Sequence, residues 1–370
     1  MDDKTQMLLD KTEKILKANM YTGIELPWGK YRMISPGKGT FRGIWNWDSA
    51  FHAIGMLSID PMIAEEQIEG FLQFQMDDGM LPDVILEDGE IENHYTKPPV
   101  MAWAAVEVYK QTHNIEFLRR VYPCMVRNER FWVEKRCLNG LFHYDADRSD
   151  DCDEERYLTR VRYESGWDDS PRWDGMPQHY WAVDLNCFMV MHYRALVYMA
   201  EELEKSSDLW KQKEIELTSL IEKRLWNEQI KAYTDYNFVE KRYTEALTPA
   251  SFMPLYIRIA GGEQAIAMND IAEKHFLPGM PTIAYDNKAY STTYWRGPCW
   301  LNVAYFAVKG LKNYGFDELA DGIRDTILNW VYEDGEYVHE NYDAKTGEGL
   351  CCDHFSWSCV FVRELLMNWQ

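Results

Sequence analysis

The sequence predicts an all-α protein, because apolar residues recur at helical spacing along most of the chain and alternating strand patterns are scarce. The clearest helical patterns cover seven segments, at residues 61–76, 98–112, 115–136, 180–204, 208–226, 292–312 and 315–332. Shorter patterns mark five more, at residues 3–18, 46–57, 246–259, 261–274 and 352–368. Six antiparallel helix pairs can close into an (α/α)6 barrel, a toroid of six hairpins that buries one face of every helix and leaves a funnel at one end. We expect this toroid, although an open helical array would contain the same helices.

Residues at the ends of these segments support the helix boundaries. Asp60 followed by Pro61 is a cap and first-turn pair, and Gly261 with Gly262 separates two short helices. No linker, low-complexity run or change of composition divides the chain, so we expect a single domain over residues 1–370. Long polar loops are expected at residues 77–97, 137–179, 275–291 and 333–351.

The composition argues against several classes of partner. The chain has 60 acidic and 39 basic residues, and its formal net charge of -21 repels nucleic acids and anionic membrane surfaces. Residues 1–20 are polar and lack the apolar core of a signal peptide, and no apolar run is long enough to cross a membrane, so we expect a cytoplasmic protein. The eight cysteines lack the paired spacing of a zinc site, so we expect reduced thiols, no metal and no cofactor.

Many of the 15 tryptophans lie beside polar residues at the junctions of loops and helices. They occur in the segments RGIWNWDSAFHA, ESGWDDSPRW, YWRGPCW and HFSWS. A sugar has an apolar face that stacks on an indole and a rim of hydroxyls that needs carboxylates, amides and guanidinium groups. By composition alone, these segments fit either a pocket for a small carbohydrate or a crowded aromatic core.

Two carboxyl groups suit the hydrolysis of a glycosidic bond, which needs one acid to protonate the leaving oxygen and one carboxylate to activate water. Asp168 follows Gly166 and Trp167, where an indole can desolvate the carboxyl and raise its pKa, as a general acid requires. Glu340 lies in the loop VHENYDAKTGEG, from which it can reach into a funnel. Spacing alone leaves open the rivals of these two residues, which are Asp169, Glu336 and Glu348.

Six motifs, in order along the chain, resemble those of glycoside hydrolase family 63, and several are shared with trehalase family 37. The motifs are RGIWNWDSAFHA, QMDDGMLPD, TKPPVMAW, ESGWDDSPRW, YWRGPCWLN, and HENYDAKTGEG followed by FSWS. This resemblance covers nearly the whole chain and implies an (α/α)6 barrel and an inverting α-glycosidase. It also implies that Asp168 is the general acid and Glu340 the general base.

The same resemblance assigns substrate contacts. Trp47 and Asp48 would lie against the sugar, whereas Arg296 would either contact substrate or pair with a loop carboxylate. Lys97 departs from the family, which often has glutamine before the two prolines, and this departure leaves a changed specificity open. The predicted substrate contacts are Trp47, Asp48, Lys97, Trp167, Arg172, Tyr294, Trp295, Arg296, Trp300 and Trp357. Of these, Arg172 is a weaker candidate, as are Gln75, Asp83 and Trp103.

The expected substrate is a short α-glucoside or α-mannoside, either a disaccharide or a glycosyl-glycerate, because the barrel uses nearly the whole chain. Single displacement would invert the anomeric carbon and needs the two carboxyl groups roughly 6.5–9.5 Å apart. The net charge opposes an acidic aglycone, but local cations could hold one, so neutral and acidic aglycones both stay open. The candidate cations are Lys97, Arg162 and Arg172.

Three other functions were weighed against this hydrolase. A trehalase-like hydrolase shares several motifs, and a carbohydrate-binding protein without activity would need the same aromatic residues. A terpene-type cyclase is also helical, and DDCDE at residues 150–154 resembles a magnesium-binding motif. The polar residues within the aromatic motifs fit a hydroxyl-rich ligand better than a terpene. No pattern in the sequence sets the oligomeric state.

Overall fold

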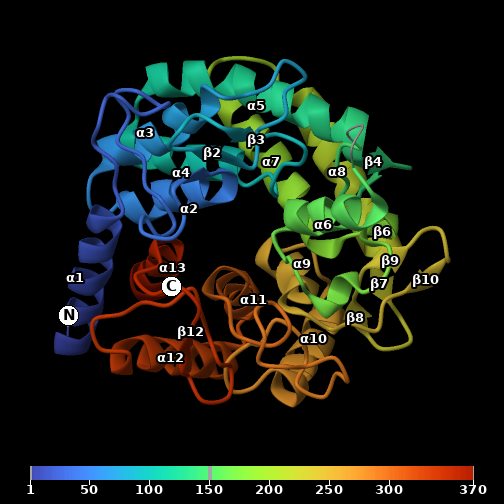
Figure 1. Cartoon of the computed structure of the whole chain (residues 1–370). Helices are drawn as coiled ribbons and strands as arrows, with labels where there is room; N and C mark the ends of the chain where they lie inside the picture. The colour runs from blue at the N-terminus through green and yellow to red at the C-terminus, as the bar shows by residue number, and fades with distance from the viewer. Residues whose placement is uncertain (1, 149–151, 370) are drawn as a thin grey trace.

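The structure is a computed structural model that describes residues 2–148 and 152–369, and helices dominate it (Figure 1). Its α-helices are α1 (Asp3–Ala18), α2 (Asn46–Met56), α3 (Pro61–Leu72), α4 (Met101–Thr112), α5 (Ile115–Arg136), α6 (Glu154–Ser165), α7 (Val183–Glu202), α8 (Asp208–Arg224), α9 (Met253–Tyr256), α10 (Gly262–His275), α11 (Leu301–Asn313), α12 (Asp317–Glu333) and α13 (Ser356–Met367). Short 3-10 helices are η1 (Pro171–Trp173), η2 (Pro177–His179) and η3 (Pro249–Phe252).

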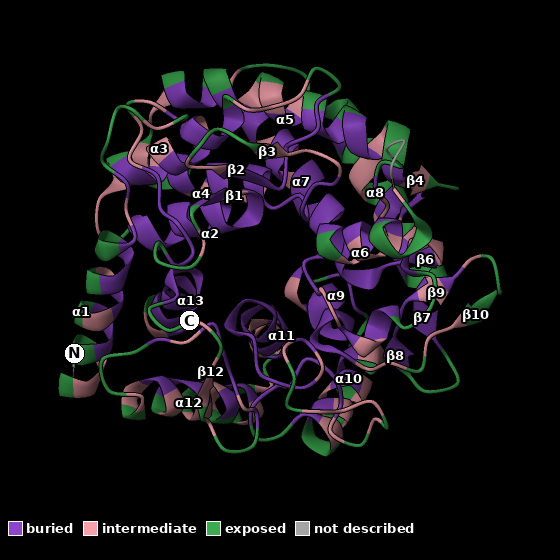
Figure 2. Cartoon of the chain, in the orientation of Figure 1, coloured by how far each residue is buried: buried purple, intermediate pink, exposed green. Residues whose placement is uncertain are grey.

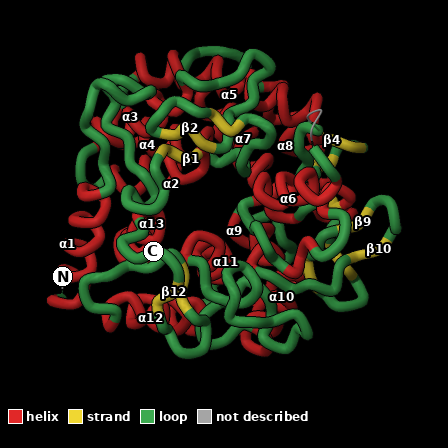
Figure 3. Tube along the Cα trace, viewed as in Figure 1, coloured by secondary structure: helices red, strands yellow, loops and turns green. Residues whose placement is uncertain are grey.

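Short strands lie in the loops between the helices (Figure 3). They are β1 (Gly43–Trp45), β2 (Val84–Leu86), β3 (Ile91–Glu92), β4 (Cys137–Leu138), β5 (Leu141–Phe142), β6 (Tyr180–Trp181), β7 (Trp226–Asn227), β8 (Ala232–Tyr233), β9 (Tyr236–Asn237), β10 (Arg242–Tyr243), β11 (Asn341–Tyr342) and β12 (Gly349–Leu350). All pairings among them are antiparallel, and the largest sheets have the orders β1-β2-β3 and β10-β9-β6. Two of these pairings hold loops of the site, because β1 leads directly into α2 and β11 directly follows Glu340.

The helices form an inner and an outer set. Helices α2, α4, α7, α9, α11 and α13 contact one another in this order, and α13 contacts α2 again, so the six close a ring (Figure 1). Outside this ring, α3 packs on α2, α8 on α7, α12 on α11 and α1 on α13. Buried residues are concentrated in the inner set, and every residue of α2 is buried (Figure 2). The first and last helices therefore meet, and residues far apart in sequence can face one space.

Capping residues explain where several helices begin and end. The Asp60 carboxylate accepts a hydrogen bond from the backbone N–H of Met62 at 3.0 Å, and Pro61 occupies the first turn of α3. The Asp153 carboxylate caps α6 in the same way, and Gly166 ends α6 with a φ of 74°. The caps of α3 and α10 lie where the sequence predicted them, because Gly261 precedes α10.

Three predicted segments need correction. Helix α6 lies inside the expected loop at 137–179, because charged and polar residues outnumber the apolar ones in its sequence EERYLTRVRYES. Helix α11 begins at Leu301, nine residues after the predicted start of 292–312, because Gly297 and Pro298 hold a tight loop there. The segment 246–259 is helical only in η3 and α9, each of which has a proline in its first turn.

Two further observations concern the described residues. No helix among them combines the length and the apolar character needed to cross a bilayer. All eight cysteines are free thiols. Asp150 and Asp151 of the acidic DDCDE run lie outside the described residues.

Candidate active site

A pocket opens where the loops before α2, α4, α11 and α13 and the loop after α6 converge. Its walls combine aromatic residues with three carboxyl groups and one lysine. The lining residues are Pro36, Phe41, Trp45, Trp47, Asp48, Lys97, Gly166, Asp168, Tyr294, Trp295, Trp300, Glu340, Phe355 and Trp357. The structure thus brings together most of the predicted site residues, from Trp47 to Trp357, which are 310 positions apart in sequence.

The aromatic wall is built in layers. Trp295 and Trp300 stack with ring centroids 3.8 Å apart and planes 11° from parallel. The indole N–H of Trp300 donates a hydrogen bond to the carbonyl of Tyr294 at 2.9 Å. On another side of the pocket, the rings of Trp47 and Trp357 lie 5.1 Å apart. These contacts fix the indoles rigidly, so an apolar sugar face could bind without ordering the walls first.

Gly166 positions the acid loop against this wall. Its φ of 74° favours glycine, and a Cβ built there would lie 2.3 Å from Cη2 of Trp47. The absence of a side chain therefore lets the indole of Trp47 lie directly on the turn that precedes Trp167 and Asp168. This close approach explains the small residue in the ESGWDD motif.

Asp168 is half-buried at the pocket wall. Burial raises the pKa of its carboxyl to about 6, and the charges of Asp83 and Asp169 act in the same direction, while the Lys97 ammonium opposes the rise. A carboxyl of this kind keeps its proton up to a higher pH than an ordinary aspartate and can donate it as a general acid.

Glu340 is held by its own loop and by an aromatic hydroxyl. The Tyr294 hydroxyl donates to Glu340 Oε1 at 3.1 Å, and the backbone N–H of Cys352 donates to Oε2 at 3.3 Å. The backbone N–H of Glu340 donates to the Cys352 carbonyl at 2.8 Å. Burial raises the pKa of the Glu340 carboxyl to about 7, with a smaller contribution from Asp168. The charge of Asp168 therefore acts on the Glu340 carboxyl within the pocket.

A buried charge cluster lies beside Asp168. Burial raises the pKa of Asp48 to about 8 even though the Lys97 ammonium lowers it. The Lys97 Nζ lies 3.4 Å from Oδ1 of Asp83 and donates a hydrogen bond to the Tyr163 carbonyl. Asp83, which is 4% exposed, is more important to the site than its rank as a weaker candidate suggested, because it is the ion-pair partner of Lys97.

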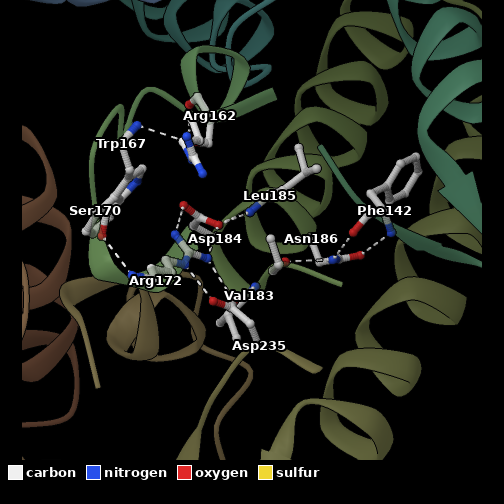
Figure 4. A network of polar contacts seen from close by, with 12 residues as sticks. Phe142, Arg162, Trp167, Ser170, Arg172, Val183, Asp184, Leu185, Asn186 and Asp235 are labelled. Atoms are coloured by element: carbon white, nitrogen blue, oxygen red, sulfur yellow. Dashed lines mark hydrogen bonds and ion pairs between the residues drawn. The ribbon is translucent and has the colours of Figure 1, made fainter. Parts of the chain in front are cut away.

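Arg172 does not line the pocket. It lies in a separate network of polar contacts with Asp184 and Asp235 (Figure 4). Its fully buried guanidinium donates to both carboxylate oxygens of Asp184 at 2.6 and 2.7 Å and to both of Asp235 at 2.6 and 2.8 Å. It also lies under the rings of Trp167 and Trp173. The prediction that Arg172 contacts substrate is therefore wrong, because its fully buried guanidinium is absent from the pocket lining and donates four hydrogen bonds to Asp184 and Asp235 inside the protein.

Trp167 and Arg296 also lie behind the pocket wall. Trp167 is 1% exposed and packs against Trp295 with a centroid distance of 5.3 Å, so it supports the wall without lining the pocket. Arg296 donates to the backbone carbonyl of Asp169 at 2.8 Å and to the Asp174 carboxylate at 3.1 Å. Of the two roles considered for Arg296, the pairing with a loop carboxylate is the one observed.

The rival carboxylates and the remaining weaker candidates do not line the pocket. Asp169 accepts a hydrogen bond from the backbone N–H of Trp295 at 2.8 Å and faces a neighbouring hollow, while Glu336 and Glu348 lie outside the pocket lining. Gln75 donates to the carbonyl of Cys124 far from the site. Trp103 lies on α4 against other core aromatics.

Five pocket residues were not predicted as substrate contacts. Gly166 lies in the ESGWDDSPRW motif, Trp45 in RGIWNWDSAFHA and Phe355 in FSWS, so these three could have been found from their neighbours. Pro36 and Phe41 lie in a loop with no apolar periodicity, and only the fold brings them to the pocket. Among the described residues, no group of three or more histidine, cysteine or acidic side chains could hold a metal ion.

A ring of helices around an aromatic pocket with two interacting carboxyls of raised pKa is the arrangement of a glycoside hydrolase. The sequence profile of the mannosylglycerate hydrolase MGH1-like glycoside hydrolase domain matches residues 42–358. The chain therefore belongs to this family, which bears out the resemblance found in its motifs.

Relatives of two kinds support this assignment. The chain is 22% identical to the mannosylglycerate hydrolase of Rubrobacter radiotolerans, over 90% of this chain and 92% of that protein. It is 24% identical to the periplasmic trehalase of Citrobacter koseri, over 90% of this chain and 67% of that protein. Among solved structures, the family 63 mannosylglycerate hydrolase of Thermus thermophilus in complex with Tris and D-glycerate superimposes with a TM-score of 0.83 and 21% identity, covering 98% of this chain and all of that one.

Proposed function

We propose that this glycoside hydrolase cleaves short α-glycosides with inversion, with Asp168 as general acid and Glu340 as general base. The observation that carries the proposal is the position of both carboxyls, each with a raised pKa, on the wall of one aromatic pocket. We also propose that residues 1–370 form a single (α/α)6-barrel domain. The closed ring of six inner helices and the outer helices packed on it support this architecture.

The proposed reaction is a single displacement. Asp168 gives its proton to the glycosidic oxygen as the bond from C1 to that oxygen breaks, and the aglycone leaves as an alcohol. Glu340 takes a proton from a water molecule whose oxygen forms the new bond to C1 from the opposite face. One proton leaves Asp168 and one arrives at Glu340, so the charges balance, and solvent exchange restores the starting state.

The proton count of the pair suits this role. With pKa values of about 6 and about 7, the two carboxyls together carry one proton between these pH values. Acid and base catalysis by a pair requires this count. The productive form has the proton on Asp168, and it is the minor of the two singly protonated forms because the pKa of Glu340 is the higher one. The Tyr294 hydroxyl and the Cys352 N–H both donate to Glu340 and favour its ionised form.

For the aglycone, we propose a small acid such as glycerate. A hollow beside the pocket shares Asp168 and Tyr294 with it, so it adjoins the side from which the leaving oxygen is protonated. Arg162 lines this hollow, and its guanidinium has no ion-pair or hydrogen-bond partner among the described residues, whereas Arg296 is paired with Asp174. The free guanidinium suits a carboxylate. Relatives named as mannosylglycerate hydrolases are consistent with this choice.

Hydrolysis assays on a panel of substrates test the proposal. Purified protein is incubated with mannosylglycerate, glucosylglycerate and trehalose, and the released sugar is measured. We expect turnover of a glycerate glycoside, and Arg162→Ala raises KM for it by about 10-fold to 100-fold while leaving trehalose turnover unaffected. Arg156→Ala, on the exposed face of α6, is the matched control and leaves KM unchanged.

One result would contradict the proposed aglycone, and a different result would contradict the proposed hydrolysis. Preference for trehalose, together with an unaffected Arg162→Ala variant, would overturn the acidic aglycone but keep the hydrolase. Binding of the sugars without turnover at any pH between 5 and 8 would support a carbohydrate-binding protein instead.

A further inference from the structure

Lys97 is the only cation among the described residues that line the pocket. Its side chain is 9% exposed, and the side chain of its partner Asp83 is 6% exposed. Burial of an ammonium group costs solvation energy unless nearby groups compensate for it. The groups that compensate for the burial of Lys97 therefore need to be identified. The compensating groups come from three different elements of the fold.

Three aspartates share the charge of Lys97. Asp48 lies in the first turn of α2, Asp83 directly precedes β2, and Asp168 follows α6. The Lys97 ammonium lowers the pKa of each of them against the opposing effect of burial, and their charges in turn raise the pKa of Lys97. Other titratable groups that act on this cluster are Tyr95, Tyr163, Glu92, Asp169 and Glu340.

Lys97 also joins the segments that carry these aspartates. Its Nζ donates to the Tyr163 carbonyl in the last turn of α6, just ahead of the acid loop. The preceding residue, Thr96, donates its backbone N–H to Glu164 Oε2 at 3.2 Å and approaches the Asn46 amide with its hydroxyl at 3.3 Å. Asn46 in turn begins α2, so consecutive residues 96 and 97 tie α2 to the end of α6.

We propose that Lys97 is a positioning residue and the resident counter-ion of the pocket: it holds the end of α6 ahead of Asp168 and balances the charges of Asp48, Asp83 and Asp168. The proposal rests on the proposed function only in treating Asp168 as the acid. This role differs from direct contact with substrate. The ion-pair partner of Lys97 is Asp83, which lies behind the pocket wall and does not line the pocket.

Two substitutions, one that removes the positive charge of Lys97 and one that removes the negative charge of Asp83, test this assignment. The readout is the dependence of kcat/KM on pH, in which activity falls on the acid side (the acid limb) and on the alkaline side (the alkaline limb). In Lys97→Met, loss of the positive charge makes the aspartates bind protons more tightly, so the alkaline limb of kcat/KM moves up by about 1 to 3 pH units. In Asp83→Asn, loss of a negative charge lowers the pKa of Asp168, so the acid limb of the same profile moves down, because Asp83 raises that pKa. In the double variant the pKa of Asp168 lies between those of the two single variants, and Lys97→Arg restores the wild-type limb.

A matched control separates charge balance from folding. Lys213 pairs with Glu129, whose side chain is 5% exposed, at a place outside the pocket. Lys213→Met lowers the melting temperature but leaves the limb in place. If Lys97→Met does not fold, the double variant with Asp83→Asn removes the unpaired carboxylate and remains testable, and its limb still has to lie near that of the wild type.

A second readout does not depend on turnover. Carbon-13 NMR of labelled aspartate carboxyls, titrated from pH 4 to 9, reports the protonation of the cluster directly. We expect the midpoints of the pocket aspartates to rise in Lys97→Met by about 1 to 3 pH units and to return in Lys97→Arg. Midpoints and limbs that stay at their wild-type values in Lys97→Met would overturn the proposal, even if the wild type hydrolyses its substrate as proposed. Shifted midpoints in a protein that hydrolyses nothing would uphold the counter-ion and reject the hydrolase.

Discussion

The Lys97 cluster and the Arg172 cluster both hold a buried cation among aspartates, but they differ in how completely those groups are hydrogen-bonded. Arg172 donates four hydrogen bonds to Asp184 and Asp235, and backbone N–H groups of Val183 and Leu185 donate to the same two carboxylates. The Lys97 ammonium, in contrast, has a carbonyl and one carboxylate at 3.4 Å, and it lines the pocket.

This difference separates a structural cluster from a functional one. A fully buried cluster whose cation already makes four charge-assisted hydrogen bonds is closed to a ligand, so it holds segments of chain together, here the acid loop, α7 and the loop before β9. An incompletely paired cluster on a pocket wall keeps donors and acceptors for sugar hydroxyls and lets its protonation respond to them. Sequence motifs that place arginine or lysine beside tryptophan do not distinguish the two cases.

We expect the largest effect on activity from a substitution of Asp168, the proposed general acid in the pocket. Asp168→Asn keeps the size of the side chain but cannot donate the proton, so we expect kcat to fall by about 10²-fold to 10⁴-fold with sugar binding retained. Asp169→Asn, at the adjacent position, is the matched control. Steady-state kinetics and calorimetric binding of both variants measure the contrast, and equal losses in the two would contradict the assignment of the acid.

On the structural side, Arg172→Met leaves two buried carboxylates without their cation. We expect the free energy of unfolding to fall by about 3 to 5 kcal/mol, which urea denaturation measures. The pH limbs of the remaining activity should stay where the wild type has them. A variant of normal stability, or one with shifted limbs, would remove the distinction between the two clusters.

The pH dependence of wild-type activity tests the proposed roles of the two carboxyl groups in the pocket. Activity needs one proton on the pair of carboxyls, so it is lost below a pH of about 6, where both are protonated, and above about 7, where both are ionised. We therefore expect kcat/KM to follow a narrow bell with its maximum between these values. A plateau extending above pH 9 would show that the alkaline limb does not come from these carboxyls.

The smallest expected effect tests the contact between the acid loop and the wall. Gly166→Ala strains a backbone with a φ of 74° and pushes against the ring of Trp47, at a cost of about 1 to 2 kcal/mol of stability. We expect KM to rise more than kcat falls, because Trp47 lines the pocket and does not exchange protons. Unchanged KM in thermally destabilised protein would mean that Trp47 does not contact the sugar.

Much of the fold could be predicted because helical periodicity is a local property. The predicted segments 115–136 and 61–76 begin where α5 and α3 begin, since Asn114 and Asp60 cap them. Helix α6 was missed because its apolar residues are few, and its stability comes from packing and from its Asp153 cap.

The site was predictable where a motif carries its own chemistry. Asp168 and Glu340 were found because an indole, a glycine and a loop mark them, and both line the pocket. Arg172 was wrongly predicted to contact substrate, because the direction of its side chain depends on Asp235, which is distant in sequence. No local sequence pattern indicates this pairing. The pairing of Lys97 with Asp83 was hidden for the same reason.

The stereochemistry of the first product tests the central claim most directly. Proton NMR follows the anomeric signals during hydrolysis of an α-glycoside such as mannosylglycerate, at a protein concentration high enough to precede mutarotation. With Asp168 as acid and Glu340 as base, water attacks C1 from the opposite face, so the β-anomer of the sugar is released first. Initial release of the α-anomer would contradict single displacement and the roles of both carboxyls.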